Sequence, residues 1–205
     1  MTSDPSLHAI VLAAGASTRF GSPKQLVRIN GRPLLHAVVS RAVAVAGHSV
    51  SVVLGANANQ LAGLLGHSGA AVIINREWQE GIASSLRAAL SQVPGSADGV
   101  LILLADQPAI SAEDLRRLVQ QWRRHPEGLV ASQYAQSIGV PAIFPRWCLR
   151  ELSELRGDRG AQLVLLRHLS RVTRMALPNA ALDIDTPEDL LALEAAKILP
   201  DGQTP

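Results

Sequence analysis

The sequence predicts an α/β fold with a mostly parallel sheet and helices on both faces. Short apolar runs of strand length alternate with stretches of helical length, and the connections between them are short. The run at 100–105 is apolar throughout, which is typical of a central parallel strand covered on both faces. No repeat, low-complexity tract or linker interrupts the 205 residues. We therefore expect a single domain over 1–205, with frayed ends at about 1–6 and 200–205.

The alternation is clearest in the first half of the chain. Pro33 suits the first position of a helix. Ser111, with Asp114 three residues later, suits a helix N-cap. The predicted strands are 7–13, 50–55, 71–74 and 100–105, and the predicted helices are 33–45, 59–65, 83–92 and 111–124.

The second half is less regular. Thr186 as N-cap and Pro187 at the first helical position predict a last helix running to about Ile198. A short extended segment at 182–185 precedes that helix. The other predicted strands are 129–132, 142–144 and 172–176, and the other predicted helices are 147–154 and 159–169.

Composition and charge exclude several classes of protein. The net charge is only +2, from 19 basic and 17 acidic residues, and aromatic residues make up 3% of the chain, so nucleic-acid binding is not expected. No stretch approaches the roughly 20 apolar residues of a membrane span. The N-terminus lacks a basic region followed by an apolar stretch, so no secretory signal is expected. The one cysteine, Cys148, excludes an internal disulfide and a cysteine-based zinc site. A cytoplasmic protein is predicted.

A glycine-containing loop at 15–21 follows the first predicted strand. Its small residues let the backbone come close to a ligand, and Arg19 and Lys24 place two cations in and just beyond it. Backbone N–H groups of a turn, together with fixed cations, can bind a phosphate chain. The loop is not a Walker loop, because Ser22 follows Gly21, and the dinucleotide fingerprint Gly-x-Gly-x-x-Gly is also missing. An ordinary turn with solvated charges is the alternative interpretation.

Carboxylates follow at two later places in the chain. Asp106 comes directly after the apolar strand at 100–105, and the carboxyl ends of parallel strands form the site edge of such a sheet. Mg²⁺ prefers one or two carboxylates together with phosphate oxygens and water, so Asp106 is a candidate ligand, with a loop-initiating or helix-capping role as the alternative. Asp183 and Asp185 lie on one face of the segment 182–185. One or both could complete a metal site or only organise the turn before the last helix.

Four stretches together resemble a known family. Leu-Ala-Ala-Gly-x-Ser-x-Arg-x-Gly-x-x-Lys at 12–24, followed by Gly-Arg-Pro-Leu-Leu at 31–35, resembles the signature of the MobA/MocA-like nucleotidyltransferases. Leu-x-Asp-x-Pro at 104–108 and Asp-Ile-Asp-Thr-Pro-Glu-Asp-Leu at 183–190 resemble two further motifs of that family. The resemblance covers nearly the entire chain. It implies a Rossmann-like domain of the nucleotide-diphospho-sugar transferase (GT-A-like) type.

The same resemblance implies the site residues. The segment 81–86 resembles one that lies against the bound nucleotide, although its serines could instead cap a helix. The segment 157–162 resembles an acceptor-side motif, but Gln162 stands where an arginine is usual, and Arg159 is a candidate substitute. The implied catalytic residues are Arg19, Lys24 and Asp106; the nucleotide-binding residues are Leu12, Ala13, Ala14, Gly15, Ser17, Arg19, Lys24, Ser84 and Ser85; the metal ligands are Asp106 and Asp185; the acceptor-binding residues are Gly139, Pro141, Asp158 and Arg159.

The implied activity is transfer of a nucleotide to a phosphorylated acceptor. Leu-Ala-Ala-Gly at 12–15 resembles the cytidylyltransferase branch of the family, and Ala14 in place of glycine leaves less room beside the base, which suits a pyrimidine. This implies a molybdenum cofactor cytidylyltransferase that uses CTP, molybdopterin and Mg²⁺ (Mn²⁺ is possible), releases pyrophosphate and serves a molybdenum hydroxylase. The alternatives are a sugar- or polyol-phosphate nucleotidyltransferase and a non-catalytic molybdenum cofactor carrier.

Overall fold

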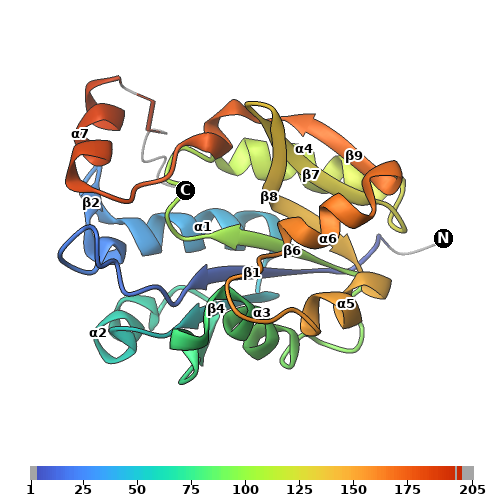
Figure 1. Ribbon diagram of the computed structural model, residues 1–205, viewed down its shortest axis with the longest axis horizontal. Coiled ribbons are helices and arrows are strands. Elements are labelled where there is room, and N and C mark those ends of the chain that lie inside the picture. The colour runs from blue at the N-terminus through green and yellow to red at the C-terminus, as the bar shows by residue number, and fades with distance from the viewer. Residues whose placement is uncertain (1–3, 197, 200–205) are drawn as a thin grey trace.

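The chain forms one seven-stranded sheet and a small two-stranded ribbon (Figure 1). The computed structural model describes residues 4–196, 198 and 199. The strands are β1 (Leu7–Ala13), β2 (Arg28–Ile29), β3 (Arg32–Pro33), β4 (Val50–Leu54), β5 (Ala71–Ile74), β6 (Gly99–Leu104), β7 (Leu129–Tyr134), β8 (Ser137–Pro145) and β9 (Val172–Ala176). The α-helices are α1 (Leu34–Ala46), α2 (Ala58–Ala62), α3 (Ile82–Leu90), α4 (Ala112–Arg124), α5 (Leu149–Ser153), α6 (Gln162–Arg167) and α7 (Pro187–Ala195).

The large sheet has the order β5-β4-β1-β6-β8-β7-β9. Strands β5, β4, β1 and β6 are parallel, β8 is antiparallel to both of its neighbours, and β9 pairs with β7 in parallel. The predicted mostly parallel sheet is therefore confirmed. Because β1 and β6 are adjacent and parallel, their carboxyl ends meet at the same edge of the sheet.

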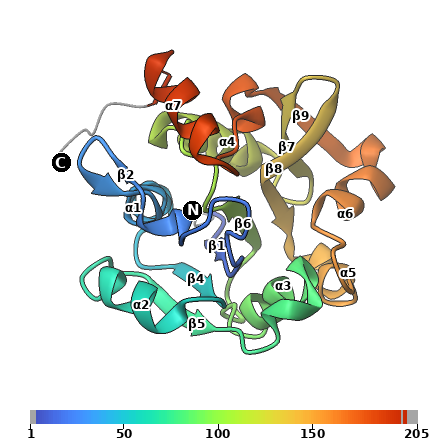
Figure 2. The ribbon, with the colours of Figure 1, turned by 60° about the vertical axis from the view of Figure 1, so that its left-hand side comes forward.

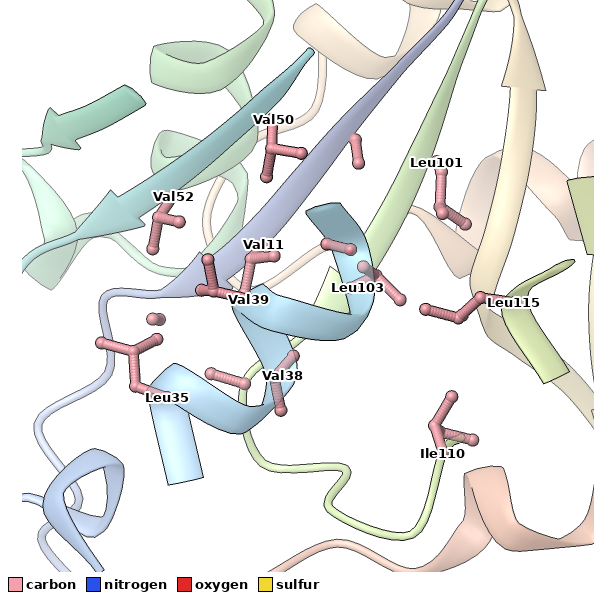
Figure 3. Packing of buried hydrophobic residues seen from close by; sticks show 14 of the residues in the cluster. Val11, Leu35, Val38, Val39, Val50, Val52, Leu101, Leu103, Ile110 and Leu115 are labelled. Carbon is pink, nitrogen blue, oxygen red and sulfur yellow. The ribbon is translucent and has the colours of Figure 1, made fainter. Parts of the chain in front are cut away.

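Side chains of the central strand β1 alternate between two apolar layers. Ala9, Val11 and Ala13 belong to one core, and Ile10 and Leu12 belong to the other. The first core includes residues of α1 and α4, and Figure 3 shows α1 side chains turned toward Val11 and its neighbours on the sheet. The second core includes residues of α3, α5 and α6. Figure 2 shows α1, α4 and α7 on the opposite side of the sheet from α3. Burial on both faces explains why the central strands are mostly apolar.

The structure corrects several predicted boundaries. The short ribbon of β2 and β3 was not predicted, and Pro33 ends β3, so that α1 begins at Leu34. Strand β8 is longer than the predicted 142–144 because it pairs with both β6 and β7. The predicted helix at 159–169 is reduced to α6 followed by a 3₁₀ turn at Leu169–Arg171. Helix α7 ends at Ala195, and segment 182–185 forms no strand.

Both predicted helix caps are present. The Ser111 hydroxyl accepts a hydrogen bond from the Asp114 N–H, and the Asp114 carboxylate accepts one from the Ser111 N–H. Thr186 and Asp189 form the same reciprocal pair at α7, with Pro187 at the first position. Each pair satisfies two backbone donors that a helix N-terminus leaves open.

Of the ends expected to fray, 1–3 and 200–205 lie outside the described residues. Ser6 N–H donates to the Asp98 carboxylate at 2.8 Å, so the expected fraying does not reach Ser6. Within the part of the chain that the structure describes, none of the helices has both the length and the apolar character needed to cross a bilayer. The cytoplasmic location stays a prediction.

Candidate active site

A hollow of about 190 Å³ opens at the carboxyl ends of β1 and β6. This volume is below the range of about 300–1,000 Å³ that is usual for small-molecule sites, so the hollow suits part of a nucleotide, such as its phosphates. The elements that form it are the loop after β1, the turn that carries Lys24, the end of β6 and the segment before α7. Its lining residues are Leu12, Ala13, Gly15, Ser17, Thr18, Arg19, Lys24, Gln25, Ala105, Asp106 and Asp185.

The loop after β1 has an unusual backbone conformation. Ser17 has a φ of 56°, a left-handed conformation that is uncommon for residues other than glycine. The Ser17 carbonyl accepts hydrogen bonds from the N–H groups of Phe20 at 3.0 Å and Gly21 at 3.2 Å. Gly21 has a φ of 78°, which only glycine adopts at little cost. The chain thus turns tightly and brings Arg19 and Lys24 back over the end of β1.

Lys24 lies at the centre of the charged groups. Its Nζ donates to Asp106 Oδ2 at 2.9 Å, to Asp185 Oδ1 at 3.0 Å and to the Ile184 carbonyl at 2.8 Å. Burial alone would lower the pKa of the Lys24 ammonium, but the charges and hydrogen bonds of Asp106 and Asp185 outweigh it, so the pKa is raised. Lys24 therefore stays protonated between two carboxylates.

Arg19 contacts the same cluster from the solvent side. Its Nη2 lies 2.7 Å from Asp185 Oδ2, and its side chain is 72% exposed. Most of the guanidinium is thus free to bind an incoming anion. In the sequence Asp106 lies more than 80 residues from Arg19 and Lys24, and the fold brings all three to one hollow.

Backbone hydrogen bonds place the two carboxylates side by side. Ala105 N–H donates to the Leu12 carbonyl at 3.0 Å, which extends the pairing of β1 with β6 up to Asp106. Ile184 N–H donates to the Asp106 carbonyl at 2.9 Å, and Asp185 N–H donates to the Asp189 carboxylate of the α7 cap at 3.0 Å. The strand end and the capped helix together fix the distance between Asp106 and Asp185.

Asp183 lies close enough to these carboxylates to be affected by them. Partial burial raises the pKa of the Asp183 carboxyl to about 6, and the negative charges of Asp106 and Asp185 add to the rise. Asp185, not Asp183, contacts Lys24 and lines the hollow.

The pair of Asp106 and Asp185 fits a divalent cation that also binds phosphate. Asp106 Oδ1 is buried and has no hydrogen-bond partner, so its lone pairs are available. Among the described residues, no three His, Cys, Asp or Glu side chains gather closely enough to hold a metal ion by themselves. Two carboxylates are nevertheless what Mg²⁺ commonly uses when substrate phosphates complete its coordination.

On the predicted nucleotide side, the serines of α3 do not line the hollow. Ser84 and Ser85 are each 3% exposed, and both hydroxyls accept hydrogen bonds from Asn75 Nδ2, at 2.8 and 3.1 Å. Ser84 Oγ also donates to the Gly81 carbonyl, so neither serine caps α3, whose N-cap is Gly81. Ala14 is buried and does not line the hollow.

On the predicted acceptor side, the residues are spread over several elements. Gly139 and Pro141 are buried in β8, whereas Asp158 and Arg159 are exposed, and none of the four lines the hollow. Gln162 Nε2 donates to Ser137 Oγ at 3.0 Å and to the Ile138 carbonyl at 2.8 Å. The Gln162 side chain therefore connects α6 to β8. It supplies no positive charge at a position where the resembled motif has an arginine.

Sequence reasoning missed several groups of this site. Gln25 and Thr18 line the hollow, and the Ile184 carbonyl accepts from Lys24. Gln25 could have been noticed as a polar residue next to Lys24 in a turn that is otherwise apolar. No signal in the sequence marks a backbone carbonyl.

The chain is similar in sequence to known proteins. Residues 9–172 match the MobA-like NTP transferase domain. The chain is 28% identical over 201 residues to nicotine blue oxidoreductase from Paenarthrobacter nicotinovorans, covering 92% of this chain and 97% of that protein. It is 35% identical over 126 residues to the bifunctional protein GlmU from Sorangium cellulosum, of which it spans only 27%.

A solved structure is similar along almost the whole chain. The crystal structure of Rv0371c from Mycobacterium tuberculosis H37Rv shares 30% identity with a TM-score of 0.78, covering 93% of this chain and 98% of that one. A second structure of Rv0371c, in complex with manganese, has a TM-score of 0.77. Given the domain match over most of its length and this likeness, the protein belongs to the MobA-like NTP transferase family.

Proposed function

We propose that this protein is a cytidylyltransferase that joins the CMP part of CTP to the terminal phosphate of a molybdopterin-type acceptor and releases pyrophosphate. The observation that carries the proposal is the convergence of Arg19, Lys24, Asp106 and Asp185 on one hollow. Phosphoryl transfer needs positioning and charge neutralisation more than covalent catalysis. Two cations and two carboxylates around a small hollow supply both.

The proposal assigns a divalent cation, Mg²⁺ or Mn²⁺, to Asp106 and Asp185. The unpartnered Asp106 Oδ1 supports this assignment, and so does the manganese complex of the mycobacterial relative. Such an ion, when bound, neutralises phosphate oxygens of the triphosphate and helps to orient them.

The reaction is a single in-line displacement. An oxygen of the acceptor phosphate forms a bond to the α-phosphorus of CTP, and the bond from that phosphorus to the bridging oxygen breaks, so that pyrophosphate leaves with the electron pair. Arg19, exposed at the rim, would bind the leaving phosphates. Lys24 would neutralise the charge that grows on the α-phosphate and the bridging oxygen. The acceptor phosphate is already anionic at neutral pH, so no general base is required.

The choice of CTP and of a molybdopterin-type acceptor rests on the resemblance at 12–15 to the cytidylyltransferase branch. The roles of Ser84 and Ser85 toward the nucleotide, and of Gly139, Pro141, Asp158 and Arg159 toward the acceptor, belong to the same proposal, as does delivery of the product to a molybdenum hydroxylase. Because Gln162 supplies no charge, Arg159 is the candidate cation for the acceptor phosphate.

A substrate panel tests this proposal. Purified protein is incubated with CTP, GTP, ATP or UTP and Mg²⁺, each with molybdenum cofactor or with common sugar and polyol phosphates, and pyrophosphate release is measured. We expect release with CTP and molybdenum cofactor, and none from an Asp106→Asn control. Pyrophosphate release only with sugar or polyol phosphates would show that the acceptor is one of these and not molybdenum cofactor. No pyrophosphate release with any nucleotide and acceptor would favour a non-catalytic carrier. Since one relative is named an oxidoreductase, NAD(P)H oxidation is followed in parallel, and oxidation without pyrophosphate release would refute the transferase.

A further inference from the structure

Gln25 is a buried amide whose side-chain hydrogen bonds all go to the end of β1 and the loop that follows it. It is 2% exposed. Its Nε2 donates to the Ala13 carbonyl at 3.2 Å and to the Gly15 carbonyl at 3.1 Å, and its Oε1 accepts from Ser17 Oγ at 3.2 Å. A glutamine amide has two N–H donors and one acceptor oxygen. The N–H donors and the acceptor oxygen of Gln25 therefore all form hydrogen bonds with one short segment, residues 13–17.

This arrangement decides which way the loop's peptide groups face. In a trans peptide unit, the C=O of one residue and the N–H of the next point in opposite directions. Gln25 turns the Gly15 carbonyl toward itself, so the Ala16 N–H points the other way. Among the described residues, the N–H groups of Ala16, Ser17 and Thr18 have no hydrogen-bond acceptor, and Gly15, Ser17 and Thr18 line the hollow.

The same contacts join the two segments that carry the cations. Ser17 Oγ donates to Gln25 and accepts from the Lys24 N–H at 3.2 Å. This pair of bonds holds Ser17 in its left-handed conformation, two residues before Arg19. The loop with Arg19 and the turn with Lys24 are thus connected through one hydroxyl and one amide.

We propose that Gln25 is a positioning residue for the triphosphate: it withdraws the Ala13 and Gly15 carbonyls from the hollow and presents the N–H groups of residues 16–18 to the phosphate oxygens. Carbonyl oxygens turned toward the hollow would repel a polyanion, whereas N–H groups bind it through charge-assisted hydrogen bonds. Gln25 acts through the loop backbone and need not touch the nucleotide. The inference rests on the proposed binding of a triphosphate at this hollow.

The test uses inorganic tripolyphosphate, which has no base or ribose, and the full-length protein without metal. Isothermal titration calorimetry compares the wild type with Gln25→Met, which keeps the side-chain length and removes all three hydrogen bonds. The matched control is Asn75→Leu. Asn75 is 5% exposed and also makes three hydrogen bonds, to Ser84, Ser85 and the Glu77 N–H, none of them to a residue of the hollow.

We expect both variants to melt at a lower temperature, but only Gln25→Met to bind tripolyphosphate more weakly, by roughly tenfold or more, the size of one lost charge-assisted hydrogen bond. Equal affinity in the wild type and Gln25→Met would show that Gln25 supports only the fold, and would overturn the proposal. A comparable loss of affinity in Asn75→Leu would also overturn it.

A measurement on the wild type keeps the proposal testable if Gln25→Met does not fold. In ¹⁵N-labelled protein, tripolyphosphate should shift the amide resonances of Ala16, Ser17 and Thr18 more than those of the rest of the chain. Binding without these shifts would overturn the role of Gln25 and leave the transferase proposal intact. Absence of any binding of tripolyphosphate or CTP by the wild type would instead refute the proposed function itself.

Discussion

Replacing Lys24 by methionine should increase the affinity for a divalent cation in the absence of nucleotide. The Lys24 ammonium lies 2.9 Å from Asp106 Oδ2 and 3.0 Å from Asp185 Oδ1. It therefore offsets part of the negative charge of the two carboxylates that we assign to the metal. A cation that enters without a nucleotide must compete with Lys24, whereas a nucleotide gives Lys24 a phosphate to bind instead.

The distances set the size of the effect. Unit charges about 4 Å apart interact with about 4 kcal/mol at an effective dielectric constant of ~20. Solvent reduces this, because the side chains of Lys24, Asp106 and Asp185 are 13%, 25% and 35% exposed, and exposed pairs are worth only about 0–1 kcal/mol. A net gain of about 1.4–2.8 kcal/mol on removal of Lys24 corresponds to roughly 10- to 100-fold tighter binding of the cation.

The assay is electron paramagnetic resonance of free Mn²⁺ titrated with protein that contains no nucleotide. Arg19→Met is the matched control: it removes the same charge, but from a side chain that is 72% exposed and contacts only Asp185 within the cluster, so its Mn²⁺ affinity should change by less than about threefold. Lys24→Met should also lose transferase activity. Mn²⁺ affinity equal to or weaker than wild type in Lys24→Met, or an equal gain in both variants, would refute the reasoning.

Three other predictions follow from single residues. Asp106→Asn should lose Mn²⁺ binding and turnover while keeping its circular dichroism spectrum; full activity would remove Asp106 from the metal site. Burial lowers the pKa of His8 below 6.5, so the unfolded chain takes up a proton that the folded one resists, and the free energy of unfolding should fall as the pH drops from 7 to 5. Denaturation at several pH values should show a flatter dependence in His8→Gln; identical slopes would exclude His8 as a cause. Ser111→Ala should lower the free energy of unfolding by about 1 kcal/mol through loss of the α4 cap, measured by urea denaturation; an unchanged midpoint would contradict this.

Much of the fold could be predicted because local pattern and tertiary environment agree. Strand β1 was expected at its observed bounds, and the caps at Ser111 and Thr186 are where the sequence indicates. A strand buried on both faces is mostly apolar, and a capping box pairs a hydroxyl with a carboxylate three residues later. The weaker predictions concern 137–145 and 159–171, where pairing with distant strands and short turns decides the limits of each element.

The position of the site followed from the sequence, but its internal contacts did not. A glycine loop after the first strand and Asp106 after an apolar strand have to meet once β1 and β6 pair in parallel. The contact of Lys24 with Asp185, across 161 residues, exists only because the α7 cap places Asp185 at the same edge.

The sequence by itself determined a mostly parallel α/β domain, the loop with Arg19 and the nearby Lys24, and the carboxylate that faces them. Strand periodicity, helix caps and small loop residues are local properties. Only the tertiary structure decided that Ser84 and Ser85 are buried against Asn75 and that Gln25 holds the loop. The same polar residue type can bind a ligand or form hydrogen bonds to buried polar groups of the protein. The sequence does not distinguish these two roles, and only the packing around the side chain decides between them.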